Sequence, residues 1–176
     1  MTGPPSFRIL VVDDNAAIHD DFRRILTPPE SGSDLEAHAA MIFGTGATTA
    51  KPKLPPFELH SAFQGQEALA MIREEHSHQR SYALAFVDMR MPPGWDGHQT
   101  INKLWDVDPH LNVVLCTAYS DYSWDELQSG LRLKQKWLIL KKPFDRVEVI
   151  QLAQVLAEKW QLACEVVTKH PHALGS

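Results

Sequence analysis

Five side chains that could do chemistry follow short apolar runs of the sequence. Asp13 and Asp14 come after the first run, and Asp88, Thr117 and Lys142 come after three later ones. In a parallel sheet the carboxyl ends of the strands meet at one edge, where ligands bind. We therefore expect these side chains to meet in one site, although a single strand-end aspartate more often caps a helix or forms a turn.

The residue types in this group indicate the kind of ligand. A carboxylate in such a place can serve as a metal ligand, a general base or a nucleophile. The carboxylates of Asp13, Asp14 and Asp88 would repel one another unless a cation joined them, and oxygen ligands suit Mg²⁺ or Mn²⁺. Lys142 adds a positive charge on a flexible stem, and Thr117 adds a hydroxyl donor. Together they predict a site for a small, doubly charged oxyanion beside a divalent metal.

Strand-like and helical segments alternate five times along the chain. Such alternation predicts a parallel sheet with helices on both faces, and right-handed crossovers fix most of its topology. We therefore expect an α/β fold of the flavodoxin-like (βα)5 type, with strand order 2-1-3-4-5. The expected strands span 7–12, 57–62, 82–87, 112–116 and 137–140, and the expected helices follow Asn15, span 64–75, carry Ile101 to Trp105, span 124–133 and follow Asp145.

Two segments lie outside this regular pattern. Residues 28–56 hold five prolines and three glycines. Connections in compact α/β units usually run about 2–6 residues, so we interpret 28–56 as an insertion, either a surface excursion or an element that docks a partner. The domain as a whole spans 1–160. Residues 161–176 extend the last helix into a polar tail, which leads either to solvent or to a further domain.

The last helix carries a second apolar pattern. Leu152, Leu156, Ala163 and Val166 are spaced roughly as a heptad seam, which Lys159 interrupts. A helix that packs on its own sheet and then frays explains the pattern, and a helix that dimerises is the alternative.

Composition limits the class of protein. The chain has 176 residues and a net charge of −5, without a lysine- or arginine-rich block, so we do not expect nucleic acid as a direct partner. We find no stretch long enough to span a membrane and no secretion signal. Cys116 lies in an apolar run and is expected to be a buried thiol in a reducing compartment, which favours a cytoplasmic protein. We expect the nine histidines to be exposed to solvent.

Four motifs at the expected strand ends resemble those of one protein family. They are Ile9-Leu-Val-Val-Asp-Asp14, Val87-Asp-Met-Arg-Met-Pro92, Cys116-Thr-Ala118 and Lys142-Pro-Phe144. In this order they are similar to the receiver domain of two-component response regulators. The resemblance covers residues 7 to about 160, apart from the insertion.

The resemblance implies a role for each site residue. Asp88 would accept a phosphoryl group from a partner's phosphohistidine. Asp14 would bind Mg²⁺ directly, Asp13 directly or through water, and Asp88 and the backbone carbonyl of Arg90 would complete the protein ligands. Lys142 would pair with one phosphoryl oxygen.

The resemblance also implies a role for Thr117, the conformation of one proline peptide bond and the kinds of partner protein. Thr117 would hydrogen-bond a second phosphoryl oxygen, and the Lys142–Pro143 peptide bond would be cis. The partners would be a histidine kinase or phosphotransfer protein and an output domain or protein that the sequence does not identify. Such a domain catalyses its own phosphoryl transfer and dephosphorylation and turns over no foreign substrate.

The sequence departs from the family pattern at three places. The loop 92–97 is one residue longer than usual. Ile139 stands where the family usually has a switch aromatic, so Trp137, two residues earlier on the same side of the strand, is the candidate substitute. Arg90 and Tyr119 each follow a site residue by two positions, and their bulk predicts slow loss of the phosphoryl group.

Two other functions and two dimer surfaces stay open. A phosphatase of the haloacid dehalogenase type also uses an aspartyl phosphate, but it needs a second aspartate where Arg90 stands. A pseudo-receiver would act as an interaction domain without phosphorylation. A homodimer could form through the surface of 124–133, 137–140 and the last helix, or through the last helix alone.

Overall fold

The computed structural model describes residues 6–27, 55–118, 123–133 and 136–169 of the chain. Nearly all of the insertion, as well as Tyr119, lies outside these residues. The strands are β1 (Phe7–Val12), β2 (Phe57–Ala62), β3 (Leu84–Asp88), β4 (Asn112–Ala118) and β5 (Trp137–Lys142). The helices are α1 (Ala16–Leu26), α3 (Gly65–Ser77), α4 (Gly97–Val107), α5 (Trp124–Gly130) and α6 (Arg146–Lys169).

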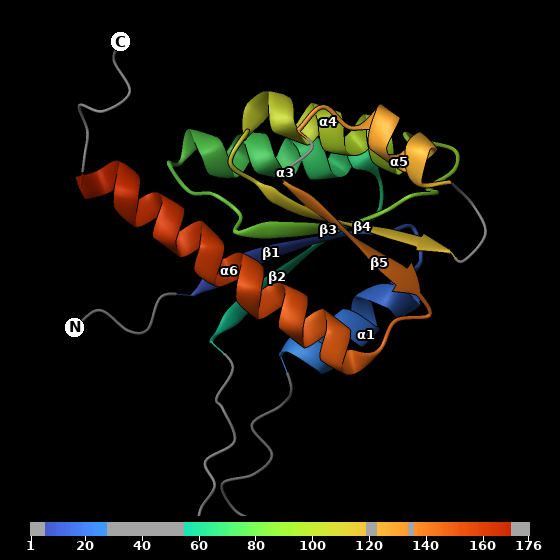
Figure 1. Ribbon diagram of the computed structural model, residues 1–176, viewed down its shortest axis with the longest axis horizontal. Coiled ribbons are helices and arrows are strands. Elements are labelled where there is room, and N and C mark those ends of the chain that lie inside the picture. Colours follow the sequence, from blue (N-terminus) through green and yellow to red (C-terminus); the bar gives the residue numbers. More distant parts are fainter. Residues whose placement is uncertain (1–5, 28–54, 119–122, 134–135, 170–176) are drawn as a thin grey trace, which may run out of the picture.

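The five strands form one parallel sheet in the order β2-β1-β3-β4-β5, which confirms the predicted topology. Helices α1 and α6 cover one face of the sheet, and α3, α4 and α5 cover the other (Figure 1). The strand ends are in register where the site is expected. Asp88 lies beside Cys116, and Ala118 lies beside Lys142.

Some element boundaries differ from the expectation. β3 begins at Leu84 rather than at residue 82, because pairing with β1 begins at Ile9 and Leu84. β4 and β5 run two residues further than expected, to Ala118 and Lys142. The helix expected over 124–133 ends at Gly130, since Leu131 already has an extended backbone.

Side chains cap the helices at the predicted starts. The Asn15 side chain accepts a hydrogen bond from the Ala17 amide, and Asp145 accepts one from the Val147 amide. Ser123 and Glu126 form a reciprocal capping box at the start of α5. Such bonds satisfy amides that have no partner inside the helix.

Two hydrophobic clusters hold the layers together. The one under α1 and α6 includes Phe22, Phe86 and the buried thiol of Cys116, as expected. The one under α3, α4 and α5 includes Leu104 and Trp105. Burying such side chains contributes roughly 1.5–3 kcal/mol each.

The histidines do not all face solvent, and this expectation was wrong in part. His76 and His78 are exposed, whereas His19 is buried and His60 is half-buried. His19 lies three and seven residues before Phe22 and Leu26, on the buried stripe of α1. None of the helices described here is both long and apolar enough to cross a bilayer.

A polar group at the amino-terminal end of the sheet gives one testable prediction. His60 Nε2 donates to Glu58, so its Nδ1 accepts from the hydroxyl of the buried Tyr82 at 2.7 Å. Replacing Tyr82 with phenylalanine should cost about 1 kcal/mol at neutral pH, because this hydrogen bond is lost.

The same variant should differ in its response to alkali. Burial raises the pKa of Tyr82 above its ordinary value of 10.0, so the folded protein keeps a proton that the unfolded chain loses. Above pH 10 this residue alone lowers wild-type stability by up to about 1.4 kcal/mol per pH unit, and the variant lacks that loss. Urea unfolding at neutral and alkaline pH measures the difference, and parallel pH curves for the two proteins would contradict it.

Candidate functional site

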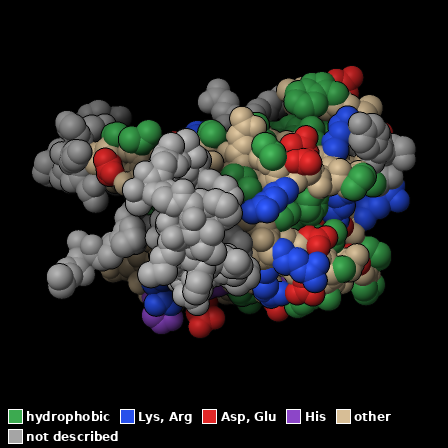
Figure 2. Space-filling view, turned by 90° about the horizontal axis from the view of Figure 1, so that it is seen from below, with side chains coloured by type: hydrophobic (Ala, Val, Ile, Leu, Met, Phe, Trp, Pro, Cys, Tyr) green, Lys and Arg blue, Asp and Glu red, His purple; other side chains and the backbone are tan. Residues whose placement is uncertain are grey.

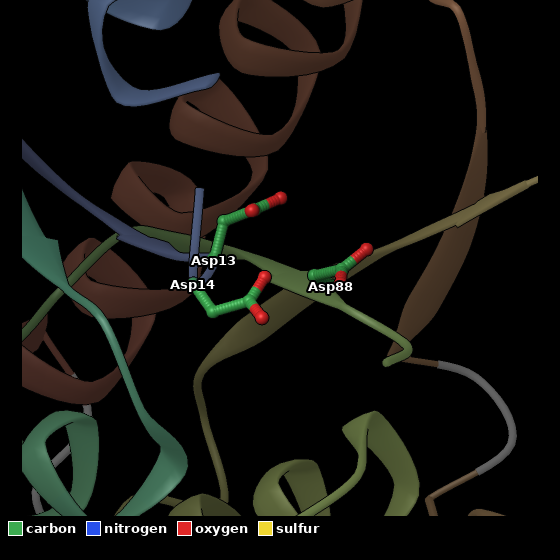
Figure 3. Close-up of side chains that lie close together, drawn as sticks. All are labelled: Asp13, Asp14 and Asp88. Atoms are coloured by element: carbon green, nitrogen blue, oxygen red, sulfur yellow. The ribbon is translucent and has the colours of Figure 1, made fainter. Parts of the chain in front are cut away.

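Three carboxylates meet at the carboxyl ends of β1 and β3. Asp13 and Asp14 directly follow β1, and Asp88 is the last residue of β3. One oxygen of each lies within 4.8 Å of the others, and Figure 3 shows the three side chains gathered at these strand ends. Asp13 and Asp88 are buried, whereas Asp14 is exposed. The cluster is therefore open to solvent through Asp14.

Lys142, at the end of β5, reaches into this cluster. Its Nζ lies 2.6 Å from Oδ2 of Asp13 and 2.8 Å from Oδ1 of Asp88. The lysine thus joins two carboxylates from different strands, and its side chain is 22% exposed. The sheet brings four of the five predicted site residues into one cluster.

Burial and charge set the pKa values of this group. Burial raises the pKa of Asp88, and the nearby Asp13 charge adds to this, whereas the hydrogen bond and charge of Lys142 act against it. Burial also favours the neutral form of Lys142. The hydrogen bonds and charges of Asp13 and Asp88 outweigh that effect and leave the pKa of Lys142 raised. The lysine therefore stays charged at neutral pH and partly neutralises the cluster.

Asp13 is held in place by its own loop. Its Oδ1 accepts a hydrogen bond from the Asn15 amide, and its backbone amide donates to the Ala62 carbonyl. The buried His19 lies with Nε2 2.7 Å from the Asp13 carbonyl oxygen, so that nitrogen carries the proton and donates. Sequence reasoning missed this positioning residue, and the signal that could have found it is its place on the apolar stripe of α1.

The loop after Asp88 returns against the strand end. The Arg90 amide donates to Oδ2 of Asp88 at 3.2 Å, and the Gly97 amide donates to the Met89 carbonyl. A Cβ atom at Gly97 would come within 2.8 Å of the Asp88 carbonyl oxygen, which leaves room there for glycine alone. α4 then begins with Asp96 as its cap. The peptide bonds before Pro93 and Pro143 are both cis, the second as expected.

Thr117 lies near the carboxyl end of β4, the strand beside that of Asp88. It is 5% exposed, and its hydroxyl donates to the Ala118 carbonyl at 3.3 Å. On β5, Trp137 and Ile139 face the same cluster of hydrophobic side chains, as predicted. Trp137 stacks on Trp124 of α5, with ring centroids 5.7 Å apart.

The donor set of this cluster fits a hard divalent cation. All of its anionic ligands are carboxylate oxygens from two adjacent strand ends, and one of them faces solvent. Mg²⁺ favours such a set because it keeps several waters and binds through a few carboxylates.

Comparisons with known proteins agree with this geometry. The sequence-family model that describes the response regulator receiver domain matches residues 53–154, which is more than half of the chain. A search of curated protein sequences gave no match.

Solved structures of low identity share the fold. A CheY-like receiver domain protein from Methanospirillum hungatei is 20% identical over 90% of this chain and 99% of its own, with a TM-score of 0.59. A Rhodopirellula baltica protein described as an adenylate cyclase is 19% identical over 96% of this chain and 100% of its own, with a TM-score of 0.67. NtrX from Brucella abortus, solved with ADP, is 21% identical over 98% of this chain but 31% of its own, with a TM-score of 0.64. Taken with the family match and the sheet order, these findings show that the chain belongs to the response regulator receiver domain family of two-component systems.

Proposed function

We propose that the chain is a phosphoacceptor switch in which Asp88 receives a phosphoryl group from the phosphohistidine of a histidine kinase or phosphotransfer protein. One observation carries the proposal. Asp88 is a buried carboxylate at the end of a central strand, with a lysine 2.8 Å away and two further carboxylates beside it. Such a group can hold both a metal and the transferring phosphoryl group. In this proposal the domain catalyses the transfer of the phosphoryl group to its own Asp88 and turns over no foreign substrate.

The reaction is a displacement at phosphorus. A carboxylate oxygen of Asp88 attacks the phosphorus atom and forms a new P–O bond. The P–N bond of the phosphohistidine breaks, and its electron pair returns to the imidazole nitrogen. The product on this chain is an acyl phosphate.

The other site residues bind and orient the phosphoryl group. Phosphoryl transfer depends mostly on positioning and on neutralising charge on the equatorial oxygens. Asp13, Asp14, Asp88 and the Arg90 carbonyl would hold Mg²⁺, which would supply part of that positive charge, and Mn²⁺ would suit the same ligands. Lys142 pairs with one phosphoryl oxygen after it leaves Asp88 Oδ1. Thr117 donates to another after its hydroxyl turns away from Ala118.

The state of the site is transmitted through β4, β5 and the surface of α5 and α6. A phosphoryl group adds about −1.5 to −2 charge, which draws Thr117 and Lys142 inward from adjacent strands. Trp137, stacked on Trp124, takes the place of the missing switch aromatic, since Ile139 has no polar group. The partner that reads this surface is a separate output protein or a domain joined to this one. Direct contact with nucleic acid or a membrane is not part of the proposal.

The test is intact mass after incubation with acetyl phosphate. We expect one phosphoryl adduct on the wild-type chain with Mg²⁺, none without Mg²⁺, and none on Asp88→Asn. Asp125→Asn, an exposed aspartate on α5, serves as the matched control and should be modified as the wild type is. The adduct should also persist for minutes or longer, given the bulk of Arg90.

A different outcome would point to the pseudo-receiver. If the wild-type chain is folded and binds Mg²⁺ but gives no adduct, phosphorylation at Asp88 is not its function. An adduct that persists in Asp88→Asn would place the modification on another residue.

A further inference from the structure

One peptide bond links two of the three carboxylates in the cluster. It carries the carbonyl oxygen of Asp13 and the amide of Asp14. Because a peptide unit is planar, the orientation of this one plane helps to set the directions in which both side chains leave the backbone. β1 ends at Val12 and α1 begins at Ala16, so the plane lies between the two elements. A further contact must hold it if both carboxylates are to face the same metal.

The buried side chain of His19 makes that contact. Its Nε2 lies 2.7 Å from the Asp13 carbonyl oxygen, and since a carbonyl oxygen only accepts, Nε2 donates. His19 is 1% exposed and Asp13 is 3% exposed, so water has little access to this hydrogen bond. Without the donor, the carbonyl would be buried and unpaired, and the peptide plane would turn toward another donor.

His19 departs from the pattern of its own helix. The view from below shows charged side chains on the side of the molecule where α1 and α6 lie (Figure 2). The other polar side chains of α1 are all charged and exposed, namely Asp20, Asp21, Arg23 and Arg24. His19 instead lies on the buried stripe of α1, beside the ring of Phe63 at a centroid distance of 4.5 Å.

Packing alone does not explain a histidine at this place. Within the described part of the chain, no group is hydrogen-bonded to the buried Nδ1 of His19. A buried acceptor without a partner costs free energy, which an apolar side chain of similar size would avoid. Departures from local rules of this kind are expected where a residue serves the function of the protein. The Nε2 donor is therefore what distinguishes His19 from an apolar residue.

We propose that His19 is a positioning residue for Mg²⁺, acting through the Asp13 carbonyl on the directions of the Asp13 and Asp14 carboxylates. The inference rests on the proposed function for the identity of the metal. Groups that hydrogen-bond behind the ligands of a metal orient those ligands, and their loss typically lowers metal affinity about 10–100-fold. His19 would have this role without contacting the metal itself.

Isothermal titration calorimetry with Mg²⁺ alone tests this role on the full chain. His19→Leu keeps an apolar side chain on the stripe and removes the donor, so we expect the Mg²⁺ dissociation constant to rise roughly tenfold or more. His19→Gln carries an N–H donor at a similar distance from the backbone and should bind within about threefold of the wild type. Leu26→Val, at the other end of the same buried stripe, is the matched control. It should destabilise the fold and leave Mg²⁺ affinity unchanged.

These outcomes separate the inference from the proposed function, because calorimetry needs no phosphoryl donor. Weaker binding in His19→Leu that is restored in His19→Gln supports the inference, whether or not Asp88 accepts a phosphoryl group. Equal affinity in His19→Leu and the wild type would overturn it, and so would equal weakening in His19→Leu and Leu26→Val. A wild type that is folded but binds no Mg²⁺ would overturn it together with the proposed metal site.

A measurement on the wild type alone covers the case in which His19→Leu does not fold. Long-range ¹⁵N–¹H spectra show which ring nitrogen of a histidine carries the proton. We expect His19 to be protonated on Nε2 and its ring signals to shift when Mg²⁺ is added. Protonation on Nδ1 instead, or ring signals that do not respond to bound Mg²⁺, would contradict the positioning role.

Discussion

Replacing Lys142 with methionine is expected to destabilise the metal-free protein by about 2–3 kcal/mol at neutral pH. The lysine amine donates to both Asp13 and Asp88, and the side chains of these two aspartates are 4% and 11% exposed. Removing the amine leaves two neighbouring buried carboxylates without their shared counter-charge. The cost is placed below that of a fully buried ion pair because Lys142 is partly exposed.

The loss of stability in Lys142→Met should depend on pH and on Mg²⁺. Without Lys142, the pKa of Asp88 rises further, and a raised folded-state pKa gives stability that is present at low pH and lost as the pH rises. The deficit should therefore shrink on acidification. Added Mg²⁺ should reduce it too, since the cation replaces the lost positive charge. Guanidinium unfolding at several pH values, with and without Mg²⁺, measures both effects.

Lys141→Met provides the control for this prediction. Lys141 is the preceding residue on the same strand, and it is exposed. We expect its replacement to change stability by a few tenths of a kcal/mol, as is usual at the surface. If the two variants are equally stable, the contacts of Lys142 in the cluster contribute nothing to folding.

The fold could be predicted from the sequence because its signals are local and repeated. Each strand is a short apolar run, each helix shows its own periodicity, and handed crossovers leave few topologies. The strand ends that carry Asp88 and Lys142 follow directly from that pattern. The ends of the elements were harder to predict. At Leu131 the apolar periodicity of a helix continues in the sequence, but the backbone is already extended.

Contacts of individual side chains could not be predicted in the same way. The sequence places Lys142 and Asp13 at one edge of the sheet, but not which carboxylates the amine will join. His19 was missed because a polar residue on an apolar stripe does not reveal its partner, the Asp13 carbonyl. The sequence left Leu156 open between packing on the sheet and a heptad seam, because neighbouring helical positions differ in burial only once the helix is docked. Leu156 packs on the sheet. The chemistry at Thr117 and Arg90 remains a prediction.

Replacing Asp14 with asparagine should change the metal-free and metal-bound proteins in opposite directions. Asp14 is the exposed member of the cluster, and the single charge of Lys142 is shared between Asp13 and Asp88, so the three carboxylates keep a net negative charge. Without metal, removing the Asp14 charge relieves repulsion, so the variant should be more stable by about 0.5 kcal/mol. With metal, a ligand is lost, and Mg²⁺ affinity should fall at least about tenfold.

Thermal unfolding over a Mg²⁺ titration measures both changes in one experiment. Ligand that binds the folded state raises stability by RT ln(1 + [L]/Kd), so a weaker site shifts the whole titration to higher Mg²⁺. Asp20→Asn, an exposed aspartate on α1, is the control and should follow the wild type. Because the two signs are opposite, the curves of Asp14→Asn and the wild type should cross. A variant that is less stable without metal yet gains as much from Mg²⁺ as the wild type would show that Asp14 acts in the loop and not as a metal ligand.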